Sequence, residues 1–180
     1  MTAAFGLGRT LAPAAASQQP VDNSTPWVAA SEGNVPLLQH ALTTLQLTAQ
    51  CADEHGYTLL QAAASYSQVA VMQWLLSPQA AAHHAAGNAA GSSVDVNAVD
   101  NEGDSALHYA DKVVAAKFLV ETAGMDTSIT NAMGKTAILA KQDELNEMMQ
   151  DEDMEDDDED LIHLRALTEY LNSLNAAMAQ

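Results

Sequence analysis

Apolar residues recur along the chain at the spacing of helix faces. Three groups would each line one side of a helix: Leu37 and Leu38; Val71, Leu75 and Leu76; Phe118 and Leu119. A fourth face predicts a helix over 161–180, formed by Leu161, Leu164, Leu167 or Leu171, and Leu174. Small pairs such as Ala29-Ala30 and Ala62-Ala63 would let neighbouring helices lie close together. The pattern therefore predicts short helices that pack in thin layers.

A short motif occurs four times, each time with a hydroxyl residue in the equivalent place. Thr25 and Thr58 are separated by 33 residues. Ser105 follows 47 residues after Thr58, and Thr136 follows 31 residues after Ser105. The longer middle spacing is explained by a segment of Ala, Gly, Ser and His at 77–93, which we expect to be an inserted loop. One copy cannot bury its apolar face alone, so the copies are expected to stack.

These copies resemble ankyrin repeats, in which a glycine precedes Thr-Pro-Leu-His, an alanine pair, a second helix with a leucine pair, and a turn with Asp and Asn. The second copy reads HGYTLLQAAASYSQVAVMQWLLS, and the third reads EGDSALHYA and then AAKFLVETAGMDTSIT. The resemblance covers about residues 23–141 and implies an all-α ankyrin-repeat solenoid of three clear repeats and one degenerate repeat. Proline is kept only at Pro26 and histidine only at His108, and the third copy is short between its helices. We do not expect the fourth copy to form a full helix pair.

The hydroxyl residues are expected to cap the first helix of each copy. A Thr or Ser oxygen there accepts from a backbone N–H that has no partner within the helix, an effect of about 1 kcal/mol. Pro26 would take the first helical position, where a missing N–H costs nothing. Two residues before the hydroxyl, three glycines would adopt the positive φ of a hairpin tip: Gly56, Gly103 and Gly134.

The stretch GDSALHYA at 103–110 also resembles the nucleophile block of GDSL esterases, and DLIH at 160–163 resembles their Asp-x-x-His pair. Ser105, however, occupies the equivalent place to Thr58 and Thr136, so capping explains it. The sequence has neither the Gly-x-Asn-Asp block of those enzymes nor alternating strand and helix patterns. An esterase is therefore a remote alternative, and no catalytic residue is predicted.

Charge narrows the classes of partner. The chain has 24 acidic and six basic residues, a net charge of -18, which repels nucleic acid and anionic membranes and attracts basic proteins. No run reaches the roughly 18 apolar residues of a membrane span. His83 and His84 have no companion ligands nearby, so no metal or cofactor is predicted. With Cys51 alone, no internal disulfide can form, which favours a cytoplasmic and possibly nuclear location.

The domain organisation follows from these patterns. We expect a disordered tail at 1–21, repeats over 22–150, an acidic linker at 151–160 and a C-terminal helix at 161–180. Nine of the ten linker residues are acidic and carry half the net charge, so the linker should stay solvated rather than helical. It is interpreted either as a solubilising spacer or as a clamp for a Lys/Arg-rich protein. The final helix either caps the stack or is offered to the groove of a partner.

Residues at the hairpin tips, on the inner helices and in the linker are the candidates for partner binding. Tyr57, Tyr66 and Tyr109 are included because aromatic side chains often anchor interfaces. The full set is Glu54, His55, Tyr57, Ser65, Tyr66, Asn101, Glu102, Asp104, Tyr109, Met133, Lys135, Asp151, Glu152, Asp153, Glu155, Asp156, Asp157, Asp158, Glu159 and Asp160.

The resemblance extends to short, stand-alone ankyrin proteins of fungi and other eukaryotes, some of which are dedicated chaperones or assembly factors. It implies a monomeric, non-catalytic protein that binds a basic client through the tips and inner helices, with the acidic linker shielding the basic segment. The alternative is a regulatory adaptor or inhibitor in signalling or transcription, which would use the groove alone.

Overall fold

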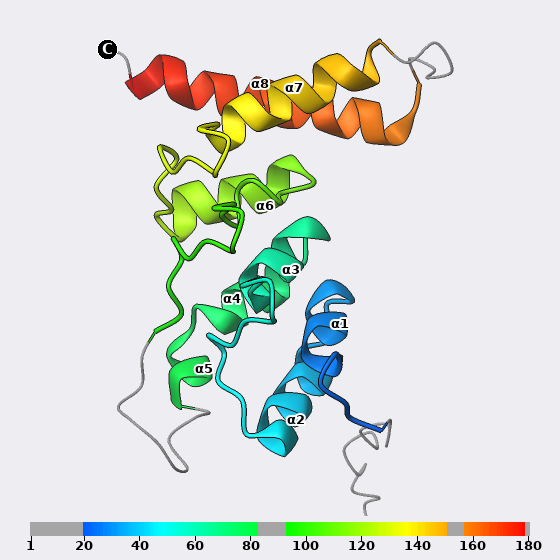
Figure 1. The fold of residues 1–180 in the computed structure, drawn as a ribbon, viewed down its shortest axis with the longest axis vertical. Coiled ribbons are helices and arrows are strands. Elements are labelled where there is room, and N and C mark those ends of the chain that lie inside the picture. The colour runs from blue at the N-terminus through cyan, green and yellow to red at the C-terminus, as the bar shows by residue number, and fades with distance from the viewer. Residues whose placement is uncertain (1–19, 83–92, 151–156, 179–180) are drawn as a thin grey trace, which may run out of the picture.

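The chain forms an elongated row of helices (Figure 1). The computed structural model describes residues 20–82, 93–150 and 157–178. Regular secondary structure there is helical, and strand-like pairing is confined to isolated bridges. The all-α class is thus confirmed for the described residues. Most of the predicted tail, of the loop after Ala82 and of the acidic linker lies outside them.

The first helix pair consists of α1 (Thr25–Ser31) and α2 (Val35–Leu45). The prediction that Thr25 caps α1 is wrong, because the helix already includes Thr25. Thr25 Oγ1 instead donates to Asp22 Oδ1 and accepts from the Asp22 backbone N–H, both at 2.9 Å. Asn34 caps α2, since its side chain accepts from the Leu37 N–H at 3.1 Å. The hydrogen bonds between Asp22 and Thr25 close a tight turn at the start of α1.

The second pair consists of α3 (Leu59–Ser65) and α4 (Val69–Leu75). Thr58 caps α3 as predicted: its hydroxyl accepts from the Gln61 N–H at 3.2 Å, and Gln61 Oε1 accepts from the Thr58 N–H at 2.6 Å. This reciprocal capping box fixes where α3 begins. The short α5 (Pro78–Ala82) lies within the predicted loop 77–93, so the start of that segment is helical rather than irregular.

The third copy departs most from the sequence prediction. Ser105 is followed by a turn, not by a helix, and the outer element consists of α6 (Val113–Lys117) continuing into the π-helical η1 (Phe118–Thr122). α6 begins eight positions after Ser105, whereas α4 begins eleven positions after Thr58. About one helical turn is missing, which leaves too few residues for an inner helix. The prediction that Ser105 caps a helix is therefore wrong.

The row ends in a pair of long helices, α7 (Ala137–Met148) and α8 (Glu159–Met178), which lie side by side (Figure 1). Thr136 caps α7 as predicted, by accepting from the Leu139 N–H at 3.4 Å. α8 also packs against α6. The fourth copy itself contributes only α7, as expected, and its helix partner is α8, the predicted C-terminal helix, which packs against the end of the row. That partner follows the acidic run.

α8 begins inside the predicted acidic linker. Asp158 Oδ1 accepts from the Asp160 N–H at 2.9 Å and from the Leu161 N–H at 3.4 Å, so Asp158 caps the helix. Glu159 and Asp160 lie in the first turn, where negative charge is stabilised by the helix dipole. The prediction that the acidic run excludes helix is wrong for these two residues. The run connects two packed helices.

Buried apolar side chains form one continuous core from Ala29 in α1 to Leu171 in α8. A polar contact reinforces its last layer: the Tyr170 hydroxyl donates to Glu121 Oε1 at 3.0 Å, and Lys117 Nζ lies 5.4 Å from the centre of the Tyr170 ring. α8 is thereby fastened to the third outer element as well as to α7. Among the described helices, none has the length and apolar character needed to cross a membrane.

Candidate functional site

Three turns of the same geometry precede the second, third and fourth hydroxyl residues. Each opens with an Asp or Asn whose side chain accepts two backbone N–H groups. Asp53 accepts from residues 55 and 57 at 2.8 and 2.9 Å. Asp100 accepts from 102 and 104 at 3.0 and 2.9 Å. Asn131 accepts from 133 and 135, both at 3.1 Å. Local side-chain bonds of this kind shape tight turns without help from a sheet.

Each of these turns holds a glycine in the left-handed conformation and closes with a bridge to the hydroxyl residue. The φ values of Gly56, Gly103 and Gly134 are 78°, 79° and 72°, as predicted from their spacing. The bridges pair Ala52 with Thr58, Val99 with Ser105, and Thr130 with Thr136. The turns are therefore structurally equivalent, although the elements that follow them differ.

Backbone hydrogen bonds join successive turns. The Asn101 N–H donates to the His55 carbonyl at 2.9 Å, and one turn further the Ala132 N–H donates to the Glu102 carbonyl at 2.7 Å. Asn131 Nδ2 also donates to Asp104 Oδ1 at 2.9 Å. The three turns therefore form one continuous edge of the molecule.

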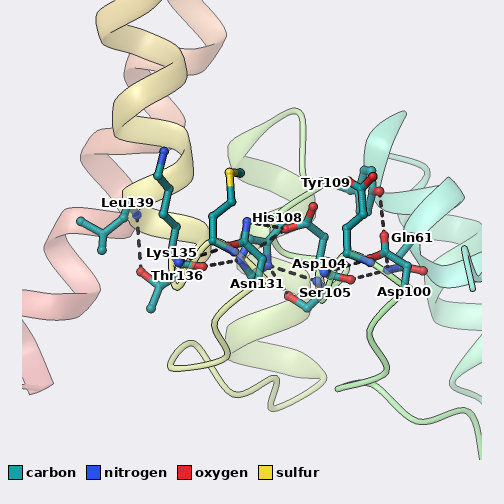
Figure 2. Close-up of polar contacts among 12 residues, drawn as sticks. Gln61, Asp100, Asp104, Ser105, His108, Tyr109, Asn131, Lys135, Thr136 and Leu139 are labelled. Carbon is teal, nitrogen blue, oxygen red and sulfur yellow. Dashed lines mark hydrogen bonds and ion pairs between the residues drawn. The ribbon is translucent and has the colours of Figure 1, made fainter.

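A second set of bonds comes from the residue three positions after the hydroxyl. Gln61 Nε2 donates to the Asp104 carbonyl at 2.6 Å, and the equivalent His108 contacts the Lys135 carbonyl through Nε2 at 3.1 Å. Figure 2 shows these contacts as a line from Gln61 to Lys135. Because the Ser105 N–H donates to His108 Nδ1 at 3.1 Å, Nε2 carries the imidazole proton and donates. These hydrogen bonds hold consecutive turns at a fixed spacing.

Ser105 and His108 form a contact that resembles a nucleophile and its base. Ser105 Oγ lies 2.9 Å from His108 Nδ1, and Asp104 Oδ1 lies 3.8 Å from His108 Nε2. Ser105 is only 1% exposed, however, and the imidazole already bonds the next turn. A substrate could not reach Ser105 Oγ without opening the turn. The pair therefore supports the structure of the turn.

The three candidate tyrosines lie in different environments. Tyr66 is 63% exposed. Tyr57 and Tyr109 are half-buried and pack edge to face with ring centres 5.0 Å apart. The Tyr57 hydroxyl lies 2.8 Å from Ser65 Oγ, and the Tyr109 hydroxyl donates to Asp100 Oδ2 at 2.7 Å. Tyr66 is thus the most accessible of the three, whereas the Tyr57 and Tyr109 hydroxyls bond within their own copies and the two rings pack across the second and third copies.

Burial controls the ionisation of the paired tyrosines. Desolvation, strengthened by the hydrogen bond to Asp100, raises the pKa of Tyr109. Desolvation also raises the pKa of Tyr57, partly offset by the bond to Ser65. Both phenols therefore stay neutral at physiological pH and keep their hydrogen bonds.

The outward side of the turns forms what we call the tip surface: Glu54, His55, Asn101, Glu102 and Met133. All five side chains are exposed. Asp104 and Lys135 lie beside it, half-buried, and Lys135 Nζ forms a 2.8 Å ion pair with Asp143 that raises the lysine pKa. The structure thus brings the predicted tip residues together along one edge.

The predicted acidic residues are only partly described. Asp157, Glu159 and Asp160 are exposed at the start of α8, whereas Asp158 is half-buried as its cap. The other five lie outside the described residues: Asp151, Glu152, Asp153, Glu155 and Asp156. Within the described residues, no group of His, Cys, Asp and Glu has the arrangement of a metal site.

Sequence reasoning missed the residues that organise the turns. Asp53, Asp100 and Asn131 each stand five residues before the hydroxyl, a regular spacing that could have revealed them. Gln61 and His108 also share a position, but their different side chains conceal the common role.

Comparison with known proteins finds no match, either among family models or among curated sequences. The repeated turns, the exposed tip surface and the charge are therefore the features that bear on function.

Proposed function

We propose that this chain is an ankyrin-repeat protein that binds another protein and performs no catalysis. Three features recur in three consecutive turns and support this proposal. An Asp or Asn side chain accepts two backbone N–H groups, a glycine is left-handed, and a bridge pairs with the hydroxyl residue. Stacked repeats of this kind present extended surfaces suited to folded partners. The tip surface and Tyr66 would supply the contacts.

The partner proposed is a Lys/Arg-rich client, with this chain acting as its chaperone or assembly factor. Residues 135–180 contain 13 acidic and three basic residues, a net charge of -10 out of -18. In the sequence, the acidic run lies between α7 and α8, which pack together. This concentration of acidic residues is the observation that carries the proposal, because dense negative charge steers association and favours basic surfaces.

A regulatory adaptor that uses the tip surface and Tyr66, without the acidic run, is the second candidate. Tyr66 and Met133 are 63% and 72% exposed, and large exposed apolar side chains of this kind can anchor a partner without help from the acidic run.

The burial of Ser105 argues against the esterase. A reduced cytoplasmic or nuclear setting is proposed as well, and burial raises the pKa of the Cys51 thiol to about 11, which keeps it unreactive.

Affinity purification from cell extract, followed by mass spectrometry, tests the two candidates. The wild-type chain is compared with a variant that neutralises the acidic run but keeps the α8 cap: Asp151→Asn, Glu152→Gln, Asp153→Asn, Glu155→Gln, Asp156→Asn and Asp157→Asn. We expect the wild type to recover a basic protein that the variant recovers weakly, and that elutes as salt screens the charge.

A permuted variant is the matched control. It keeps the composition of residues 151–157 and changes only their order, so it should bind as the wild type does if charge density is what the client recognises. Equal recovery by the neutralised variant, together with loss on Tyr66→Ala, would instead establish the adaptor. Recovery that ignores both changes would contradict both candidates.

A further inference from the structure

Each turn except the last is covered by the turn that follows it. A Cβ atom added at Gly56 would lie 3.1 Å from the backbone of Asp100 and Asn101, and one at Gly103 would lie 3.0 Å from the backbone of Asn131 and Ala132. A Cβ atom added at Gly134 would meet nothing within 4 Å. Within the described residues, the turn that contains Gly134 therefore leaves one side of the row uncovered.

The uncovered turn carries apolar side chains where the preceding copies carry polar ones. His55 and Glu102 occupy the tip position that Met133 fills, and Met133 is 72% exposed. Gln61 and His108 occupy the position three residues after the hydroxyl that Leu139 fills, and Leu139 is 49% exposed. Figure 2 shows Leu139 at the end of the line of polar contacts. The last layer of a solenoid normally presents polar residues to solvent, so this exchange favours a covering partner.

Acidic residues continue the same face. Asp143 and Glu147 follow Leu139 at intervals of four, which places the three side chains along one side of α7. Glu147 is exposed, and the Asp143 side chain is 48% exposed beside Lys135. We call Met133, Leu139, Asp143 and Glu147 the end surface. Its first two side chains are apolar and its last two are acidic.

We infer that the end surface binds an amphipathic, Lys/Arg-rich helix of a partner protein, an inference that rests on the proposed function and names the part of the client that is held. Apolar side chains of that helix would cover Met133 and Leu139, while its basic side chains would face Asp143 and Glu147. A second copy of this chain fits less well, because each copy carries a charge of -18.

Two synthetic peptides of roughly 18 residues, long enough to form a helix, serve as probes. One has leucines at helical spacing among lysines; the other has serines in place of the leucines and the same charge. Fluorescence anisotropy with the full chain should show the Leu/Lys peptide binding at least about tenfold more tightly than the Ser/Lys peptide. Leu139→Ser combined with Met133→Ser should remove most of that preference.

The control is Val114→Ser, which removes a 53% exposed apolar side chain from α6 and should leave the preference unchanged. Equal affinity for the two peptides, or a preference that survives the double substitution, would overturn the inference. Binding of both peptides with strong salt dependence would then still support the proposed function, whereas binding of neither at low salt would contradict that function too. Concentration-dependent dimers in sedimentation that dissociate on Leu139→Ser would show that a second copy is the occupant and overturn the choice of partner.

Discussion

Gly103 and Gly134 have the same backbone conformation and different neighbours. Both have φ values above 70°, a region in which a side chain is strained. At Gly103 an added Cβ atom also meets the backbone of the next turn, which cannot move aside without shifting Asn131. The two glycines therefore separate the cost of the conformation from the cost of stacking.

We predict that Gly134→Ala lowers the free energy of unfolding by about 1 to 2 kcal/mol, the cost of a left-handed alanine. Gly103→Ala should cost at least about 1 kcal/mol more, because contact with the next turn is added. Urea denaturation followed by circular dichroism measures both. Equal losses would mean that the turns do not press on one another as described.

Thr168 offers a substitution that should stabilise the chain. It is 5% exposed, and its Oγ1 atom is buried without a hydrogen-bond partner. Thr168→Val replaces the hydroxyl by a methyl group and should raise the free energy of unfolding by about 1 kcal/mol. The matched control Thr58→Val removes a cap and should lower it by about 1 kcal/mol. Destabilisation by Thr168→Val would indicate that Oγ1 has a partner in solution.

At the scale of the element, η1 and α8 depend on each other. Tyr170 of α8 donates to Glu121 of η1, and burial together with this bond raises the tyrosine pKa to about 12. The unfolded chain ionises this phenol near pH 10, so its contribution is fully present below pH 10. It is lost as the pH rises from there through about 12.

Tyr170→Phe tests this coupling. In the wild type, the free energy of unfolding should fall between pH 9.5 and pH 11.5, because the unfolded tyrosine releases its proton first. The Phe variant should be less stable at pH 8 and should show a shallower decline above pH 10. Tyr57 and Tyr109 titrate in both proteins, so the difference between the two profiles reports Tyr170. Identical slopes would contradict the bond to Glu121.

At the same scale, part of the structure could be predicted from the sequence and part could not. The caps at Thr58 and Thr136 and the conformations of the turn glycines were predictable, because those features depend on local chemistry. The prediction failed at Ser105 because too few residues follow it to form an inner helix, although the motif itself is present. The start of α8 was missed because the local cap by Asp158 outweighs the repulsion of neighbouring acids. The end surface needed coordinates, since only they show which turn is uncovered.

At the scale of the whole molecule, the charge is concentrated in one part of the sequence, residues 135–180. The pair α7 and α8 is joined by the acidic run, and residues 135–180 carry more than half of the net charge. This repulsion opposes folding of the last layer, while Asp158 and the helix dipole offset part of it. For the proposed function, this would mean that the same charge lowers the stability of the fold and attracts basic partners.

We predict that raising the salt concentration from about 0.05 to 0.5 M increases the melting temperature, because screening reduces repulsion between like charges. The variant with a neutralised acidic run should begin at a higher melting temperature and gain less from salt. Scanning calorimetry measures both. A melting temperature that falls with salt would mean that favourable ion pairs dominate instead.

The most direct test of the central claim is the salt dependence of affinity for the purified client. Isothermal titration calorimetry at several salt concentrations compares the wild type with the variant neutralised over 151–157. The account predicts that the wild-type Kd rises steeply with salt and that the neutralised variant binds more weakly with a flatter dependence. Equal affinities and equal slopes for the two proteins would contradict it.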